Sequence, residues 1–205
     1  TLGLFSEATI RLVEVPRATL TALVHFDRLE DVGEAVPKLL ELYPSALEVM
    51  DANTLNLIGR AKHGIPADAA ATLLVELDDD AKGIDLWAQA KRMLEICRRF
   101  RLTSDPLLAL EPEQRGQLWK ARKALYPTLY RFDPRKKPIN FVDDVVVPAE
   151  RISELIRYLE EFFEEQRVPV AIFGHIGNGN AHIIPLLDVN NQDDFQKMVR
   201  GYSEI

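Results

Sequence analysis

The segment VPVAIFGHIGNGNAHIIPLLD, residues 168–188, contains two short apolar runs separated by a turn of glycine and asparagine. Both runs are rich in β-branched residues, which is typical of strands. Asn178 and Gly179 form the dipeptide most typical of a type I′ turn. We therefore predict a β-hairpin centred on these two residues. In that register His175 lies directly opposite His182.

The predicted hairpin makes the two histidines a candidate metal-binding pair. Directly opposed side chains share one face of a hairpin, with Cβ atoms about 4.5–5.5 Å apart. Asn180 shares that face because it lies two residues before His182. Two imidazoles at this separation can bind one divalent ion, but they can equally be ordinary hydrogen-bonded side chains. No third ligand stands at a clear spacing, and we expect His25 and His63 at the surface or at a strand edge.

Strands and helices alternate along the rest of the chain. The apolar patterns predict strands at 18–26, 45–51, 70–77 and 139–147, with 103–110 a loop or an edge strand. They predict helices at 30–43, 52–62, 81–100, 111–126 and 148–166, and an amphipathic helix that includes Phe195, Met198, Val199 and Tyr202. The order of elements predicts an α+β fold, an antiparallel sheet with helices on one face, built from ferredoxin-like units. In helix 81–100 we expect Trp87, Ala90, Leu94 and Cys97 to face inward.

Composition excludes several classes of function. The formal net charge is −7 and no basic stripe follows the helices, so we expect no nucleic-acid partner. The single cysteine, Cys97, excludes an internal disulfide and favours a cytoplasmic location, with at most peripheral contact to a membrane. No apolar run approaches the roughly 18 residues that a transmembrane helix needs.

Other polar residues are weaker candidates. Arg122 lies three residues after Trp119 on a predicted helix, where an arginine can hold a carboxylate through two hydrogen bonds, although a solvated helix face is the commoner outcome. Asp143 and Asp144 lie in the middle of a predicted strand, so one of them faces inward or into a cleft. The basic loop 131–137 is expected to be solvated. No nucleotide-binding glycine loop precedes a helix.

Several motifs together resemble one protein family. GHIGNGNAH, residues 174–182, is similar to the G-H-x-G-[DN]-G-N-x-H motif of the FAD-linked oxidase C-terminal domain, found in D-lactate dehydrogenases, the glycolate oxidase flavoprotein subunit and D-2-hydroxyglutarate dehydrogenases. TLGLFSEATIRL (1–12), ALEVMD (46–51), LWKARKAL (118–125) and DDVVVP (143–148) resemble further motifs of this family in the same order. The resemblance covers nearly the whole chain.

The resemblance implies an enzyme that oxidises a D-2-hydroxy acid with FAD. It implies that His175 and His182 bind a divalent metal, zinc or manganese, that Arg122 holds the substrate carboxylate, and that Asn180 lies near the substrate. The family's third metal ligand and its proposed base, a glutamate and a histidine in an E-H-G motif, are expected downstream of Ile205. The closest likeness is to members fused to an iron–sulfur domain.

The resemblance also implies domain boundaries. Residues 1–16 match the tail of a preceding FAD-binding domain, and residues 17–205 match the substrate domain, truncated at its C-terminus. We therefore expect this chain alone to bind little flavin. We expect residues 1–16 to be extended, with Leu4, Phe5 and Ile10 packing against another copy of the chain in a homodimer. Two alternatives are a non-enzymatic α+β domain with a structural histidine–metal site and a metal-dependent hydrolase.

Overall fold

The computed structural model describes all residues except 1–3, 5, 13, 80–84 and 141, and also leaves out the side chains of residues 142 and 143. The described strands form one antiparallel sheet in the order β4-β1-β3-β2-β7-β8-β5, with β6 also paired to β8. The strands are β1 (Thr19–Phe26), β2 (Ala46–Asp51), β3 (Ala71–Asp78), β4 (Leu107–Ala109), β5 (Lys137–Pro138), β6 (Val142–Val146), β7 (Val170–Gly174) and β8 (Asn180–Leu187).

The helices connect these strands in the alternating order that the sequence predicts. They are α1 (Leu29–Leu40), α2 (Ala52–Ile58), α3 (Leu86–Cys97), α4 (Pro112–Leu129), α5 (Ile152–Glu165) and α6 (Gln192–Glu204), with short 3-10 turns η1 (Arg60–His63), η2 (Ala149–Arg151) and η3 (Ile176–Asn178). Local capping sets several boundaries. Asp51 accepts a hydrogen bond from the Thr54 amide at the start of α2, and Gly59 ends that helix with a φ of +81°.

The strand order confirms the predicted α+β class with ferredoxin-like units. The first unit contains β1, α1, β2, β3, α3 and β4, with α2 and η1 inserted between β2 and β3. Its strands lie in the order β4-β1-β3-β2, as in a ferredoxin-like sheet. The second unit runs β6-α5-β7-β8-α6, and its strands lie in the matching order β6-β8-β7. The units join edge to edge where β2 pairs with β7 at Val49–Gly174 and Met50–Phe173.

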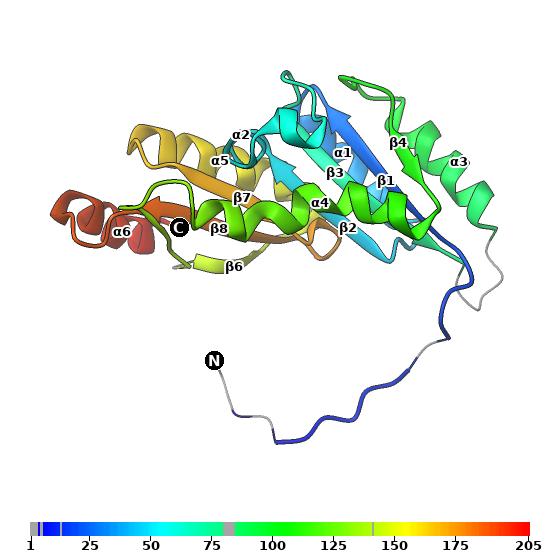
Figure 1. Ribbon diagram of the computed structural model, residues 1–205, viewed down its shortest axis with the longest axis horizontal. Helices are drawn as coiled ribbons and strands as arrows, with labels where there is room; N and C mark the ends of the chain where they lie inside the picture. Colours follow the sequence, from blue (N-terminus) through cyan, green and yellow to red (C-terminus); the bar gives the residue numbers. More distant parts are fainter. Residues whose placement is uncertain (1–3, 5, 13, 80–84, 141) are drawn as a thin grey trace.

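Helices cover the two faces of the sheet unequally. The larger core contains the apolar stripes of α1, α3 and α5, which pack on one face as predicted. A smaller core lies on the other face, where Leu55 and Ile58 of α2 and Leu125 and Leu129 of α4 cover Phe173 and its neighbours. This second layer, visible in Figure 1 as α4 crossing in front of the strands, was not distinguished by the sequence pattern.

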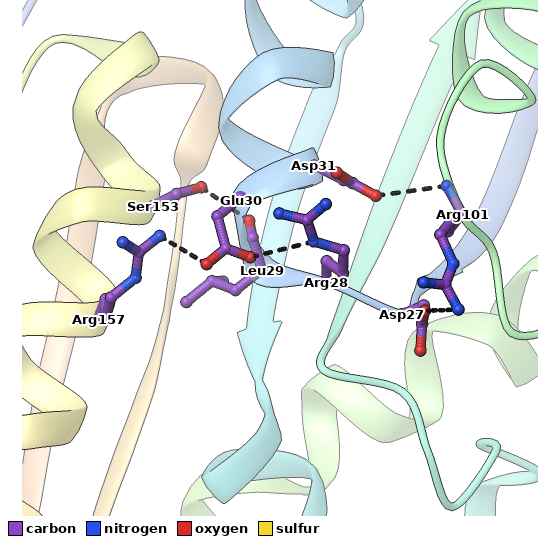
Figure 2. A network of polar contacts seen from close by, with 8 residues as sticks. All are labelled: Asp27, Arg28, Leu29, Glu30, Asp31, Arg101, Ser153 and Arg157. Carbon is purple, nitrogen blue, oxygen red and sulfur yellow. Dashed lines mark hydrogen bonds and ion pairs between the residues drawn. The ribbon is translucent and has the colours of Figure 1, made fainter.

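A network of polar contacts fixes α1 against α5 (Figure 2). The buried Ser153 hydroxyl donates to the Leu29 carbonyl at 2.8 Å, and Arg157 pairs with Glu30 at 2.7 Å. A Cβ on Gly33 would lie 2.6 Å from the Ser153 hydroxyl oxygen, so the glycine permits this close approach of the helices. The network continues to the chain after α3 through Asp27, Arg28, Asp31 and Arg101.

Two predictions about individual side chains are wrong. Trp87 is 63% exposed, because it lies on the outer side of α3 while Ala90 and Cys97 face the core. His25 is buried, because β1 is covered on both faces, and its Nδ1 lies 2.9 Å from the Thr72 hydroxyl. Burial, reinforced by the charge of Arg60, lowers the pKa of His25 to about 4, so this ring is neutral at pH 7.

The segment before β1 extends away from the body of the molecule (Figure 1). Its described residues form neither helix nor strand, and Leu4, Ile10, Leu12 and Val15 are exposed. Phe5 lies outside the described residues, and the expected homodimer stays a prediction. None of the helices that the structure describes has the length and apolar character required to span a lipid bilayer.

Candidate functional site

The turn that carries the two histidines differs from the predicted type I′ turn. β7 ends at Gly174, residues Ile176–Asn178 form a 3-10 turn, and Gly179 closes it with a φ of +69°. Phe173, not His175, lies opposite His182, so the predicted register is wrong by two residues. The 3-10 turn takes up more of the chain than a two-residue turn does. Because side chains alternate with a period of two, this shift leaves His175 and His182 on the same face.

The two imidazole rings are close neighbours. Their centroids are 5.3 Å apart and the rings meet edge to face at 84°. His175 Nδ1 lies 2.5 Å from a carboxylate oxygen of Glu48, and His182 Nδ1 lies 3.3 Å from Asp144. Asp144 also accepts a hydrogen bond of 3.0 Å from the Asn180 carboxamide. Each histidine therefore has a carboxylate at Nδ1, which orients the ring.

Arg122 joins the same group of side chains from α4. Its Nε donates to Glu48 at 2.8 Å, and its guanidinium lies over the Phe173 ring, 4.6 Å from the centroid. Glu48 is thus held between Arg122 and His175. The Glu48 side chain is only 7% exposed, and a carboxylate so deeply buried needs charged hydrogen-bond partners of this kind.

These contacts define the polar cluster, which consists of Glu48, Arg122, Asp144, His175, Asn180 and His182. Three elements of the sheet and α4 bring it together. Sequence reasoning singled out every member except Glu48. Glu48 lies in the ALEVMD motif of a predicted strand. A charged residue within an otherwise apolar strand is the sequence feature that could have identified it as a site residue. Asp143 has no described side chain.

A small cavity of about 180 Å³ opens beside the polar cluster. Glu48 and His175 line it together with the loop between α1 and β2 and with Gly177 and Asn178. Farther along the same sheet face, α4 makes a second polar contact, in which Glu76 accepts hydrogen bonds from Trp119 and Thr21 at 3.0 and 2.7 Å. The sheet-facing side of α4 is therefore partly polar, unlike those of α1 and α5.

The donor set fits a divalent metal only in part. Carboxylates at Nδ1 of both rings match the arrangement seen around metal-bound histidines, where the second ring nitrogen donates to a carboxylate. Within the described part of the chain, however, no three His, Cys, Asp or Glu side chains are grouped so that they could hold a metal ion. The histidine pair can supply two ligands, and Asp144 orients His182 instead of completing the set.

The sequence of this chain matches a known protein family and resembles several oxidoreductases. Residues 15–205 match the family described as FAD linked oxidases, C-terminal domain. The chain is 27% identical over 208 residues to "Glycolate oxidase subunit GlcD" of Bacillus subtilis (strain 168), covering 100% of this chain and 43% of that protein. It is also 27% identical to "Probable D-lactate dehydrogenase, mitochondrial" of Danio rerio, covering 100% of this chain and 40% of that protein.

Solved structures of low sequence identity share the fold. The chain resembles p-cresol methylhydroxylase with substrate bound, with a TM-score of 0.62 and 12% identity over 92% of this chain and 42% of that chain. It resembles 4-ethylphenol oxidase from Gulosibacter chungangensis with a TM-score of 0.59 and 12% identity over 90% of this chain and 42% of that chain. The chain thus spans about two fifths of the length of the proteins it matches.

Proposed function

Because the chain belongs to the family of FAD linked oxidases, C-terminal domain, we propose that it is the substrate-binding domain of an FAD-dependent dehydrogenase that oxidises a D-2-hydroxy acid. Relatives named for glycolate, D-lactate and D-2-hydroxyglutarate support this choice of substrate class. The observation that carries the proposal is the polar cluster, which places an arginine beside two histidines that share one sheet face.

In the proposed site Arg122 binds the substrate carboxylate. Glu48 engages Nε, so an incoming carboxylate meets the two terminal nitrogens of the guanidinium in a bidentate geometry. Glu48 and Phe173 hold the guanidinium in place, the first by a hydrogen bond and the second by stacking. Asn180, held by Asp144, lies on the face that the substrate would approach.

We propose that His175 and His182 supply two ligands to a divalent metal, zinc or manganese, with further ligands from outside the described set. Such a metal, when bound, polarises the substrate oxygens and lowers the pKa of the 2-hydroxyl. Glu48 and Asp144 would fix both rings with Nδ1 toward a carboxylate, which presents Nε2 as the ligating atom.

FAD in this proposal is bound mainly by a separate flavin domain, because the chain has no glycine-rich phosphate loop of its own. FAD, when bound, accepts the hydride from the substrate carbon. The partners proposed are therefore that flavin domain, an iron–sulfur domain or subunit, and the hydroxy acid. A cytoplasmic location, peripheral to a membrane, is proposed with them.

The function is tested on the natural gene product that carries this domain. Under anaerobic conditions D-lactate, D-2-hydroxyglutarate or glycolate should bleach the oxidised flavin, and the L-enantiomers of the chiral acids should not. Bleaching by none of these acids, from a preparation that is fully loaded with flavin and metal, would contradict the proposal.

Metal titration of the 205-residue chain tests the histidine pair separately. Two imidazoles are half of a closed zinc site, so we expect a dissociation constant for zinc weaker than about 1 μM, far from the roughly 10–16 kcal/mol of a four-ligand site. His175→Ala and His182→Ala should each abolish the residual binding in calorimetry. His63→Ala, which changes a histidine in η1, should leave it unchanged.

Two outcomes of the titration would contradict this reading. Tight binding that is lost in His175→Ala would mean that a third ligand is already present, and Asp144→Asn would then identify it. Residual binding that survives both histidine substitutions would place the metal elsewhere, and the histidine pair would then be an ordinary hydrogen-bonded contact.

A further inference from the structure

A second cavity, of about 460 Å³, lies at the seam between the two ferredoxin-like units. It shares no lining residue with the polar cluster. Asn53, Asn56 and Leu57 of α2, Glu160 and Glu164 of α5, and the chain Val168–Val170 that leads into β7 form its walls. Its volume lies in the range of cavities that bind small molecules.

A buried carboxylate stands behind this cavity. Asp51 is completely buried, and its Oδ1 accepts hydrogen bonds from the amides of Thr54 and Ile172 at 2.9 and 3.2 Å, so it links the two units. Its other oxygen, Oδ2, is buried and has no hydrogen-bond partner among the described residues. The Asp51 carboxyl as a whole interacts with the Glu160 carboxyl in the cavity wall. Burial raises the pKa of Asp51, and hydrogen bonds oppose that shift.

Glu160 is the half-buried member of the pair. Burial and the adjacent Asp51 raise the pKa of Glu160 to about 8. At pH 7 the two carboxyl groups therefore hold one proton between them, which lies mainly on Glu160. An incoming cation could replace that proton and leave both groups ionised.

The nearby cations do not neutralise the pair by contact. Arg60 donates no hydrogen bond to Asp51. Its guanidinium instead donates to Asn56 and to the carbonyls of Ala52, Pro66 and Ala69. Arg157 is paired with Glu30 on the side of α5 that faces α1. Glu164 adds a further negative charge at the exposed rim, and the lining residues from α2 and from Val168–Val170 are uncharged.

We propose that this cavity binds a small organic cation with a primary ammonium group, which Glu160 and Glu164 hold in front of the buried Asp51. An ammonium offers three donors, which suits a site of several carboxylate oxygens. Leu57, Val168 and Pro169 provide apolar surface for an alkyl chain. None of the described residues that line the cavity is aromatic, so a quaternary ammonium, which aromatic cages recognise, is disfavoured. A metal ion is disfavoured by the lack of a three-ligand group in the described residues.

The proposal predicts a direction for the pH dependence. The bound state requires ionised Glu160, whereas the free protein keeps it protonated below its pKa of about 8. Affinity should therefore rise about tenfold per pH unit from pH 6 to 8 and then level off, with up to one proton released per cation bound. The raised pKa of Glu160 also affects the free energy of unfolding of the free protein. Below pH 4.5, the ordinary pKa of a glutamate, Glu160 does not lower this free energy, and as pH rises from 4.5 toward 8 the free energy of unfolding falls.

Calorimetry with 1,4-diaminobutane tests the site. The diamine should bind at pH 8.5 and should release protons at pH 7, measured in two buffers of different ionisation enthalpy, whereas the isosteric 1,4-butanediol should not bind. Glu160→Gln should weaken the diamine by about 10–100-fold, the loss expected for one charged hydrogen bond, and should remove the pH dependence. A parallel titration with Nα-acetyl-lysine methylamide tests whether the bound ammonium belongs to a free amine or to the lysine side chain of a partner protein.

A matched control lies next to the site on the same helix. Glu161 is exposed and does not line the cavity, so Glu161→Gln removes the same charge and should leave the affinity within about twofold, as expected for a surface charge. Glu160→Gln keeps a polar side chain of the same size beside Asp51 and should fold normally. Equal binding of the diol and the diamine, or equal losses in Glu160→Gln and Glu161→Gln, would overturn the proposal. Neither result bears on the hydroxy-acid function, which uses none of these residues.

Discussion

Replacing Arg122 with methionine in the flavin-containing protein should lower kcat/KM for the D-2-hydroxy acid by about 10²–10³-fold, the effect of removing one partner of a buried charged pair. In the proposed function the guanidinium binds the substrate carboxylate, and methionine keeps much of the apolar volume over Phe173 without any donor. Arg122→Lys should lose less than methionine does, because it keeps the charge but lacks the planar fork. Steady-state kinetics and flavin reduction in single-turnover experiments measure both variants.

The exposed Lys123, the next residue on α4, provides the control. Lys123→Met removes one positive charge from the same helix and should change kcat/KM by less than about twofold, because an exposed charge is screened by solvent. Arg122→Met also leaves Glu48 with one partner fewer, so thermal unfolding must be followed to separate misfolding from lost binding. A folded Arg122→Met protein with unchanged KM and kcat would remove Arg122 from the substrate site.

Gly179→Ala should destabilise the fold by at least about 3 kcal/mol, in the range of severe single substitutions. Gly179 has a φ of +69°, a conformation that costs an L side chain roughly 1–2 kcal/mol. An added Cβ would also lie 1.8 Å from the Val147 carbonyl oxygen, which is backbone and cannot move aside easily. Val147 donates its amide to the Gly179 carbonyl at 3.0 Å, so relief of the clash would break the contact that anchors the end of β6.

Gly64→Ala separates the cost of a positive φ from the cost of the steric clash with Val147. Gly64 has a similar φ of +66°, but the added Cβ would meet no described heavy atom within 4 Å. It should therefore show only the conformational cost of roughly 1–2 kcal/mol. Urea denaturation of both variants gives the difference in free energy of unfolding. If the two substitutions cost the same, the close approach of the turn to Val147 does not contribute to stability.

Local pattern was enough to predict the elements and their class. The alternating apolar runs and amphipathic stripes identified most strands and most helices, because the periods of two and 3.6 residues are properties of the chain itself. The short strand β5, at the end of the predicted basic loop, was missed. The motif GHIGNGNAH identified the family, which the match over residues 15–205 confirms. It also placed His175, Asn180 and His182 on one face, a result that survives a register shift of two because it depends only on parity.

What local pattern could not supply was the partner of each side chain. Glu48 meets Arg122, 74 residues away, and His175, 127 residues away, and no periodicity encodes such distances. The same holds for the exposure of Trp87, the burial of His25 and the pairing of Asp51 with Glu160. These depend on which helix covers which face of the sheet and on how two similar units join at β2 and β7. The sequence by itself determined the elements, the family and the shared face of the histidines, whereas only the tertiary structure decided which charges are buried together, because burial is a property of the packed layers.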